Sequence, residues 1–69
     1  MEIIRIKDDF IKLGQALKLA GAVDSGVEAK IVIQDGLVLV NGKVETQRGK
    51  KLVADDVVSY DGKEFKIIQ

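Results

Sequence analysis

Basic residues crowd into the stretch VNGKVETQRGKKL, residues 40–52, of a chain that carries no net charge. They are Lys43, Arg48, Lys50 and Lys51, accompanied by a single acid, Glu45. Nucleic-acid affinity comes largely from neutralising phosphates, so a local excess of charge matters more than the net value. We predict that this stretch binds a polyanion, with Arg48 in a bidentate phosphate contact and the lysines as point charges. The alternative is a surface loop that is polar only for solubility.

A second candidate anion site lies at Ser25-Gly26. Ser25 followed by Glu28 has the capping-box pattern that begins a helix. A helix N-terminus carries unpaired N–H groups and a partial positive charge, and Gly26 has no side chain to keep a phosphate away. Lys30 follows one turn later and would lean over the same anion. The alternative is that these residues only cap the helix.

Residue types that support catalysis are scarce in this chain. It has no histidine and no cysteine, which excludes imidazole general bases, thiolate chemistry and disulfides. The acidic pairs Asp8-Asp9 and Asp55-Asp56 are adjacent in sequence, whereas acid–base catalysis needs carboxylates on opposite sides of a substrate. We therefore expect turn and cap roles for them. No clustered ligands and no glycine-rich phosphate loop are present, so we predict neither metal nor cofactor, and no enzyme.

Length and hydropathy bound the kind of protein. Sixty-nine residues predict one domain, residues 1–69, which buries only about 60% of the surface that its unfolded chain exposes. No apolar run approaches the roughly 20 residues that a membrane-spanning helix needs. The N-terminus, MEIIRIKDD, does not resemble a secretion signal. We predict a soluble, cytoplasmic protein.

The first third of the chain predicts a strand and a helix. Residues 2–7 alternate, with Ile4 and Ile6 on one side, as in a short strand. Asp8 or Asp9 is a suitable N-cap for a helix that runs to Gly21. The apolar face of this helix consists of Phe10, Leu13, Leu17 and Ala20. Its solvent face carries Lys12, Gln15 and Lys18.

A second helix is predicted from Ser25 to Gly36, and its orientation is ambiguous. One apolar stripe contains Ala29, Val32 and Ile33. A second stripe, roughly opposite, contains Val27 and Ile31. Periodicity alone does not decide which of the two faces the core.

The last third predicts two hairpins. Residues 37–40 and 43–46 flank Asn41-Gly42, and residues 57–60 and 63–68 flank Asp61-Gly62; both dipeptides favour type I′ turns. Residues 47–51 are predicted to form a loop, after which Leu52 and Val53 return to the core. The predicted fold class is α+β, with two N-terminal helices packed on a small, largely antiparallel sheet. Phe10 and Phe65 are expected in the core and Tyr60 partly exposed.

Residues 25–44, SGVEAKIVIQDGLVLVNGKV, resemble the core of the S4 RNA-binding domain family, and most closely its short free-standing bacterial members. The matching positions are Ser25, Ala29, Lys30, Ile33, Gly36, Val40, Asn41 and Gly42. The run RGKKLVADDVV, residues 48–58, resembles the basic loop and following strand of the family. The likeness covers roughly residues 10–60. It departs at Gly26, where many relatives have arginine, and at Ile31, where a basic residue is common.

The resemblance implies an S4-like fold with the alpha-L motif, in which Ala29, Val32 and Ile33 face inward. It also implies an RNA-binding accessory factor associated with translation or the ribosome, whose first helix lies near the RNA. With only three aromatic residues, the chain favours recognition of structured RNA, with ribosomal RNA as the expected target, by shape and backbone. The predicted RNA-binding residues are Lys12, Lys18, Ser25, Gly26, Lys30, Lys43, Arg48, Lys50 and Lys51.

A protein-interaction module is the alternative function. Val27 and Ile31, with Ile11 and Leu19, would then form an exposed apolar patch. Contiguous apolar patches of a few hundred Å² mark partner surfaces.

Overall fold

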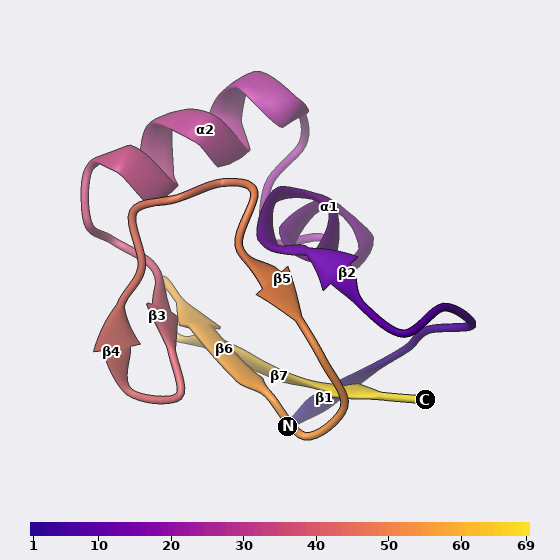
Figure 1. Cartoon of the computed structure of the whole chain (residues 1–69). Helices are drawn as coiled ribbons and strands as arrows, with labels where there is room; N and C mark the ends of the chain where they lie inside the picture. The colour runs from indigo at the N-terminus through magenta and orange to yellow at the C-terminus, as the bar shows by residue number, and fades with distance from the viewer.

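The computed structural model describes residues 1–69 as two helices and seven strands (Figure 1). The elements are β1 Glu2–Arg5, β2 Ile11–Lys12, α1 Leu13–Leu19, α2 Gly26–Gln34, β3 Leu39–Val40, β4 Lys43–Val44, β5 Lys51–Leu52, β6 Val57–Tyr60 and β7 Lys63–Ile68. Figure 1 shows both helices on the same side of the larger sheet, which confirms the predicted α+β class. Neither helix has the length and apolarity to cross a membrane.

Two separate sheets are present. The five-stranded sheet has the order β1-β7-β6-β3-β4, in which β1 runs parallel to β7 and every other pair is antiparallel. The sheet is mixed because its first and last strands in sequence, β1 and β7, lie side by side and run parallel. The two-stranded sheet pairs β2 with β5, and the sequence did not predict it.

The core lies between the helices and the sheets. Its fully buried large side chains are Phe65, Leu13, Leu17, Ile33, Leu52, Ile67, Val38 and Val58. On α2, the stripe that faces this core consists of Ala29, Val32 and Ile33, as the family resemblance implied. Val27 and Ile31, on the other stripe, are 70% and 53% exposed. The structure thus shows which apolar stripe of α2 faces the core, a question that sequence periodicity left open.

The predicted start of the first helix was wrong. The helix begins at Leu13 instead of Phe10, and its N-cap residue is Lys12, which makes no side-chain capping bond. Neither Asp8 nor Asp9 caps it, because residues 11–12 are extended and pair with β5. The end was predicted correctly, since Gly21 adopts a left-handed φ of 72°.

Three burial predictions also fail around this small sheet. Phe10 lies outside the core and is 38% exposed, whereas Ile11, expected in an exposed patch, is buried. Leu52 is fully buried as predicted, but its neighbour Val53 is 49% exposed. The alternation has a simple cause: successive residues of a strand point to opposite faces, and Ile11 and Leu52 take the inner one.

The two predicted hairpins are present, with shorter strands in the first. Asn41 and Gly42 have φ of 52° and 82°, and Asp61 and Gly62 have 52° and 78°, as type I′ turns require. The second hairpin has the predicted bounds. In the first, the ladder covers only residues 39–40 and 43–44, and one further backbone hydrogen bond follows it, from Glu45 N to Val38 O at 3.0 Å.

Candidate nucleic-acid interface

The pairing of β2 with β5 places two lysines directly opposite each other. Lys12 pairs with Lys51 in the antiparallel register, and Ile11 pairs with Leu52. Since Ile11 and Leu52 are buried, both lysines face solvent on the same side of the ladder. Like charges directly opposite each other repel and destabilise a strand pair. An anionic ligand that binds between Lys12 and Lys51 would therefore reduce the repulsion between them.

The loop between β4 and β5 is fixed against the start of α1. Leu13 N donates to Lys50 O at 2.9 Å, and Gly14 N donates to Arg48 O at 3.1 Å. These carbonyls accept hydrogen bonds from N–H groups of the first turn of α1, which a side-chain cap would otherwise accept. Figure 1 shows the loop crossing the front of the molecule from β4 toward α1. The basic loop is thus joined to the first helix by backbone hydrogen bonds.

Gly14 allows this contact to be close. A Cβ atom at Gly14 would lie 2.7 Å from the Cγ of Arg48 and 3.3 Å from its Cδ. The aliphatic stem of Arg48 therefore crosses the helix where no side chain stands in the way. Arg48, Lys12 and Lys51 consequently come from two distant parts of the sequence to the same end of α1.

Phe10 is a surface residue of this site that the sequence did not indicate. The Nζ atom of Lys51 lies 4.7 Å from the centroid of its ring, within the range of a cation–π contact. The run Phe10, Ile11, Lys12 is exposed, buried, exposed, a period of two that marks a strand. Three residues are too few for that pattern to stand out in a sequence.

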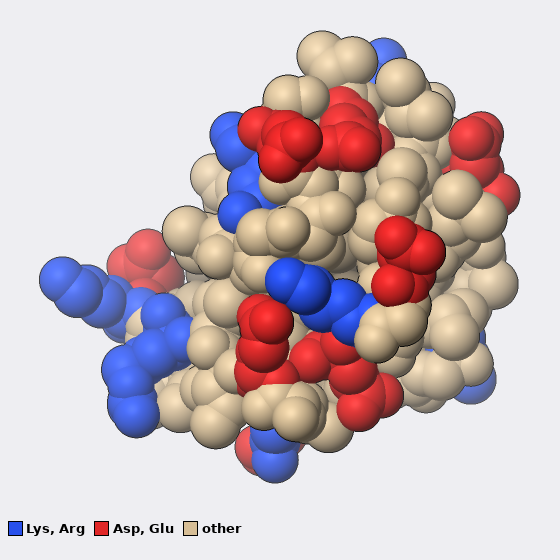
Figure 2. All heavy atoms as spheres, turned by 180° about the vertical axis from the view of Figure 1, so that it is seen from behind, with Lys and Arg blue, Asp and Glu red and all other residues tan.

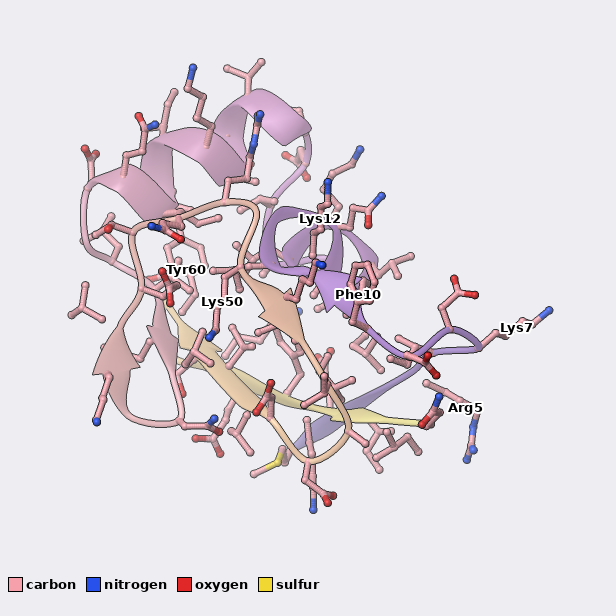
Figure 3. All side chains as sticks on the ribbon, in the orientation of Figure 1. Arg5, Lys7, Phe10, Lys12, Lys50 and Tyr60 are labelled. Carbon is pink, nitrogen blue, oxygen red and sulfur yellow. The ribbon has the colours of Figure 1, made fainter.

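Lys43 and Lys50 lie in a different hollow, beside the β3–β4 hairpin. Its lining also includes Asn41, Glu45 and Asp56. Figure 3 shows Lys50 and Lys12 pointing in opposite directions. The predicted basic residues therefore form no single cluster, and the two carboxylates beside Lys43 and Lys50 make that part of the surface less positive.

None of the predicted basic residues forms an ion pair. The two ion pairs of the protein are Lys63–Glu2 at 3.3 Å and Lys66–Asp55 at 3.6 Å. The predicted bases, all exposed, are Lys12, Lys18, Lys30, Lys43, Arg48, Lys50 and Lys51. Figure 2 shows acidic side chains over much of the centre of the face opposite to that of Figure 1. On the β2–β5 side, Asp8 and Asp9 line a hollow together with Lys12, but no acid forms an ion pair with Lys12 or Lys51.

The start of α2 is capped as predicted. Ser25 Oγ accepts from Glu28 N at 3.1 Å, and Glu28 Oε1 accepts from Asp24 N at 2.7 Å. Glu28 thus bonds to the residue before the cap rather than to the cap itself. The space beside Gly26 is open, since an added Cβ would meet nothing within 4 Å. Glu28 nevertheless already supplies the negative charge that this helix end favours.

Asn41 does more than form a turn. Its backbone N donates to Val57 O, its Oδ1 accepts from Val57 N at 2.9 Å, and its Nδ2 donates to Asp56 Oδ1 at 3.0 Å. Asp56 also accepts from Val53 N at 2.8 Å through its other oxygen. The turn role expected for Asp56 is confirmed, and Asn41 connects the β3–β4 hairpin to the start of β6.

The arrangement offers charge and shape, and no reactive group. No group of three or more His, Cys, Asp or Glu side chains is placed to hold a metal ion. All side-chain polar atoms that are buried have hydrogen-bond partners. What the site offers chemically is a set of free cations on a rigid frame.

Comparison with known proteins identifies the family. A model of the S4 domain matches residues 4–68. The chain belongs to the S4 domain family. As an S4 domain protein it is a binding protein and not an enzyme.

Two curated relatives share most of the S4 domain protein's length. It is 40% identical over 62 residues to "Putative RNA-binding protein YbcJ" of Escherichia coli (strain K12). The aligned region covers 90% of this chain and 89% of YbcJ. It is 44% identical over 59 residues to "Probable ribosome maturation protein RlbA" of Bacillus subtilis (strain 168). The aligned region covers 86% of this chain and 83% of RlbA.

A solved structure has the same fold. The solution structure of YbcJ from E. coli matches with a TM-score of 0.77 and 37% sequence identity, covering 100% of this chain and 89% of that one. It is described as revealing an αL motif involved in RNA-binding. The S4-like fold and alpha-L motif that the sequence implied are thereby confirmed.

Proposed function

We propose that this protein binds structured RNA, with ribosomal RNA as the first candidate, through a surface at the start of α1. We call this the β2–β5 surface; it consists of Phe10, Lys12, Arg48 and Lys51. The observation that carries the proposal is the placement of Lys12 opposite Lys51 with no acid paired to either. The proposal keeps the other predicted residues as outer contacts: Lys18, Ser25, Gly26, Lys30, Lys43 and Lys50.

The mode of binding follows from the kinds of side chain present. Three cations on a rigid frame contact phosphates, which fixes orientation without reading sequence. Phe10 is the one aromatic ring of the β2–β5 surface, and its face is already beside Lys51. Reading several unstacked bases needs several exposed rings. The surface therefore suits the backbone and shape of a folded RNA.

The relatives support the choice of ribosomal RNA and of a role in assembly. One carries a name that refers to RNA binding and the other a name that refers to ribosome maturation. We propose that the present protein is likewise an accessory factor of the ribosome, acts in the cytoplasm, and does so as one domain spanning residues 1–69.

A salt titration tests the proposal. We expect refolded bacterial ribosomal RNA to bind, with an affinity that falls with salt at a slope of about −3 to −4 on logarithmic axes if four phosphates are contacted. The double substitution Lys50→Glu with Lys51→Glu should lower the affinity at least tenfold and reduce that slope, because it removes two phosphate contacts and adds repulsion. Fluorescence anisotropy measures binding, and circular dichroism checks the fold. An affinity that does not depend on salt would contradict the proposal.

A protein-interaction role is the second candidate, supported by the exposure of α2. Val27 and Ile31 lie one turn apart on its outer face, and both are largely exposed. Leu19 is exposed as well, whereas Ile11 is buried and does not belong to this patch. Size-exclusion chromatography over a range of concentrations distinguishes the two roles. Self-association without retained RNA would favour the second.

A further inference from the structure

A hollow beside the β2–β5 surface has a composition that the proposed function does not use. It lies between the β1–β2 connection and α1, and its volume is about 480 Å³. Its apolar part comes from Ile6 and Ile11, whose outer edges remain accessible, and from the exposed Leu19. A volume in this range and a partly apolar lining are typical of sites for small organic groups, which occupy roughly 300–1,000 Å³.

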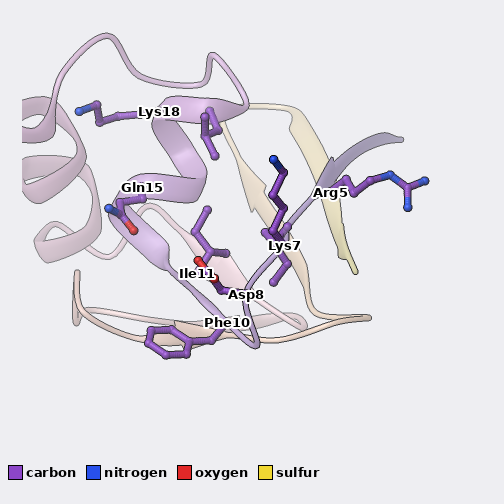
Figure 4. A pocket seen from close by; sticks show the side chains of 9 residues that line it. Arg5, Lys7, Asp8, Phe10, Ile11, Gln15 and Lys18 are labelled. Carbon is purple, nitrogen blue, oxygen red and sulfur yellow. The ribbon is translucent and has the colours of Figure 1, made fainter.

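Three cations stand around this hollow. Figure 4 shows Lys18 and Arg5 at its two sides, with Lys7 between them. None of the three forms an ion pair with Asp or Glu, although Arg5 Nη1 donates to Gln69 O at 3.5 Å. Arg5 and Lys7 were not among the RNA-binding residues predicted from the sequence. In Figure 4 the side chains of Arg5 and Lys18 extend outward from the rim. Cations at the rim of a partly apolar hollow favour a ligand whose apolar part enters the hollow and whose negative charges stay at its edges.

Two polar side chains of the hollow have no partner within the protein. The carboxylate of Asp8 and the amide of Gln15 make no hydrogen bond and no ion pair within the protein. A carboxylate accepts from N–H groups, and an amide both donates and accepts. Together they match the edge of a nucleobase, which carries both kinds of group.

The hollow is continuous with the β2–β5 surface. Phe10 and Gln15 line it, and both also line a second hollow that includes Lys12. Phe10 in turn contacts Lys51. An RNA strand held by Lys12 and Lys51 therefore needs only to continue along α1 to reach Lys7 and Lys18.

We propose that this hollow binds one unpaired nucleotide of the RNA; this inference rests on the proposed function. The base lies against Leu19 and Ile11, with its edge toward Asp8 and Gln15. The phosphates on its two sides lie near Lys18 and near Lys7 and Arg5. A nucleotide within a strand has an apolar face and a phosphate on either side, which is the pattern that the hollow presents. A folded RNA is thus held at its paired backbone by the β2–β5 surface and at a bulge or junction by the hollow.

The test uses a nucleotide without the rest of the RNA. The ¹⁵N-labelled protein is titrated with 5′-AMP, which carries base and phosphate, and in parallel with ribose 5-phosphate, which lacks the base. Backbone amide shifts are followed by NMR. We expect saturable shifts at residues 7–11 and 15–19 with 5′-AMP and much smaller ones with ribose 5-phosphate. No shift there, or equal shifts with both compounds, overturns the inference.

Matched variants separate the hollow from the rest of the surface. Leu19→Ser removes apolar contact inside the hollow, and Leu37→Ser makes the same change at an exposed leucine elsewhere. We expect Leu19→Ser to weaken 5′-AMP and ribosomal RNA binding about fivefold, because it removes apolar surface against which the base packs. Leu37→Ser should change neither. Equal effects of the two substitutions overturn the inference.

A third variant distinguishes failure of the inference from failure of the proposed function. Lys51→Gln lies outside the hollow, so we expect it to lower ribosomal RNA affinity while leaving the 5′-AMP shifts unchanged. If 5′-AMP binds but ribosomal RNA does not, the proposed function is wrong and this role in RNA binding falls with it. If ribosomal RNA binds in a salt-dependent way without 5′-AMP shifts, only the hollow is wrong.

Discussion

Asn41 shows at the scale of one residue how a turn signal acquires a second role. The sequence predicted its positive φ, because Asn-Gly is a common type I′ pair. It did not predict that the side chain reaches Asp56 and Val57, which lie 15 and 16 positions away. Turn preference is a local property, whereas this contact depends on where β6 begins. Local chemistry was therefore predictable here and long-range pairing was not.

We predict that Asn41→Ala lowers the free energy of unfolding by about 1–3 kcal/mol. The substitution removes two side-chain hydrogen bonds and places a Cβ-bearing residue without a polar group at a φ of 52°. Asn41→Gly is the control, because glycine adopts this φ freely and isolates the loss of the amide. Urea denaturation measures both. Equal stability of Asn41→Ala and the unchanged protein would contradict the role assigned to this side chain.

Lys51 and Phe10 show that the type of a single residue does not predict where its side chain lies. Lys51 was predicted as a loop cation and Phe10 as a core residue, yet the two are in contact at the surface. Phe10 is hydrophobic enough for a core, and only the pairing of β2 with β5 turns it outward. Pairing of two-residue strands leaves almost no trace in a sequence.

At the scale of elements, the site depends on a loop packed against the start of a helix. Helix periodicity predicted α1 and its end, and the apolar residues Leu13 and Leu17 are buried as expected. The start was wrong because backbone carbonyls of residues 48 and 50 replace the expected aspartate cap. Backbone carbonyls have no sequence signature, so this contact and the position of the basic loop required the structure.

We predict that Gly14→Ala displaces this loop. Alanine favours helix by about 1 kcal/mol over glycine, but its Cβ would lie 2.7 Å from Arg48 Cγ, and overpacking typically costs about 1–3 kcal/mol. The two effects oppose each other, so stability should change little. RNA affinity should fall about threefold to tenfold, because moving Arg48 disturbs one or more phosphate contacts, each of which contributes a fraction of the binding energy. Thermal denaturation and fluorescence anisotropy measure the two quantities.

The double variant Gly14→Ala with Arg48→Ala completes the cycle. With the Arg48 stem removed, the nearest atom to the new methyl group is the backbone O of residue 48, at an ordinary contact distance of 3.8 Å. Gly14→Ala should then raise stability by up to about 1 kcal/mol. If Gly14→Ala has the same effect on stability in both backgrounds, the contact between Arg48 and Gly14 does not hold the loop.

At the scale of the whole molecule, two features escape the sequence. The first is the parallel pairing of β1 with β7, which joins the two ends of the chain and makes the sheet mixed. The second is the distribution of charge. Both depend on segments that lie more than 30 positions apart, such as Lys12 and Lys51, and no local pattern encodes which distant segments meet. The family resemblance predicted the class of fold correctly because it reflects the whole arrangement at once.

The last prediction distinguishes the effect of the β2–β5 surface cations on RNA affinity from the effect of the protein's net charge. The molecule measures 28 × 20 × 18 Å, whereas salt screens charges beyond about 8 Å at physiological ionic strength. Charges on the far side therefore act weakly on an RNA held at the β2–β5 surface. Lys12→Gln with Lys51→Gln should lower affinity at least tenfold, since it removes two phosphate contacts. Asp61→Asn with Glu64→Gln makes the net charge more positive by the same amount on the β6–β7 hairpin, and it preserves the turn and an acceptor for Ser59.

We expect this second pair of substitutions to change the affinity for ribosomal RNA by less than about twofold at physiological salt, where the screening length is short. At low salt the screening length grows to about 30 Å at 0.01 M, which exceeds every dimension of the molecule. The gain from Asp61→Asn with Glu64→Gln should then become measurable, while the loss from Lys12→Gln with Lys51→Gln persists at both salt concentrations. Anisotropy titrations at the two concentrations give all four values. If both pairs shift the affinity equally and in opposite directions at physiological salt, binding follows net charge and no particular face of this neutral protein is responsible.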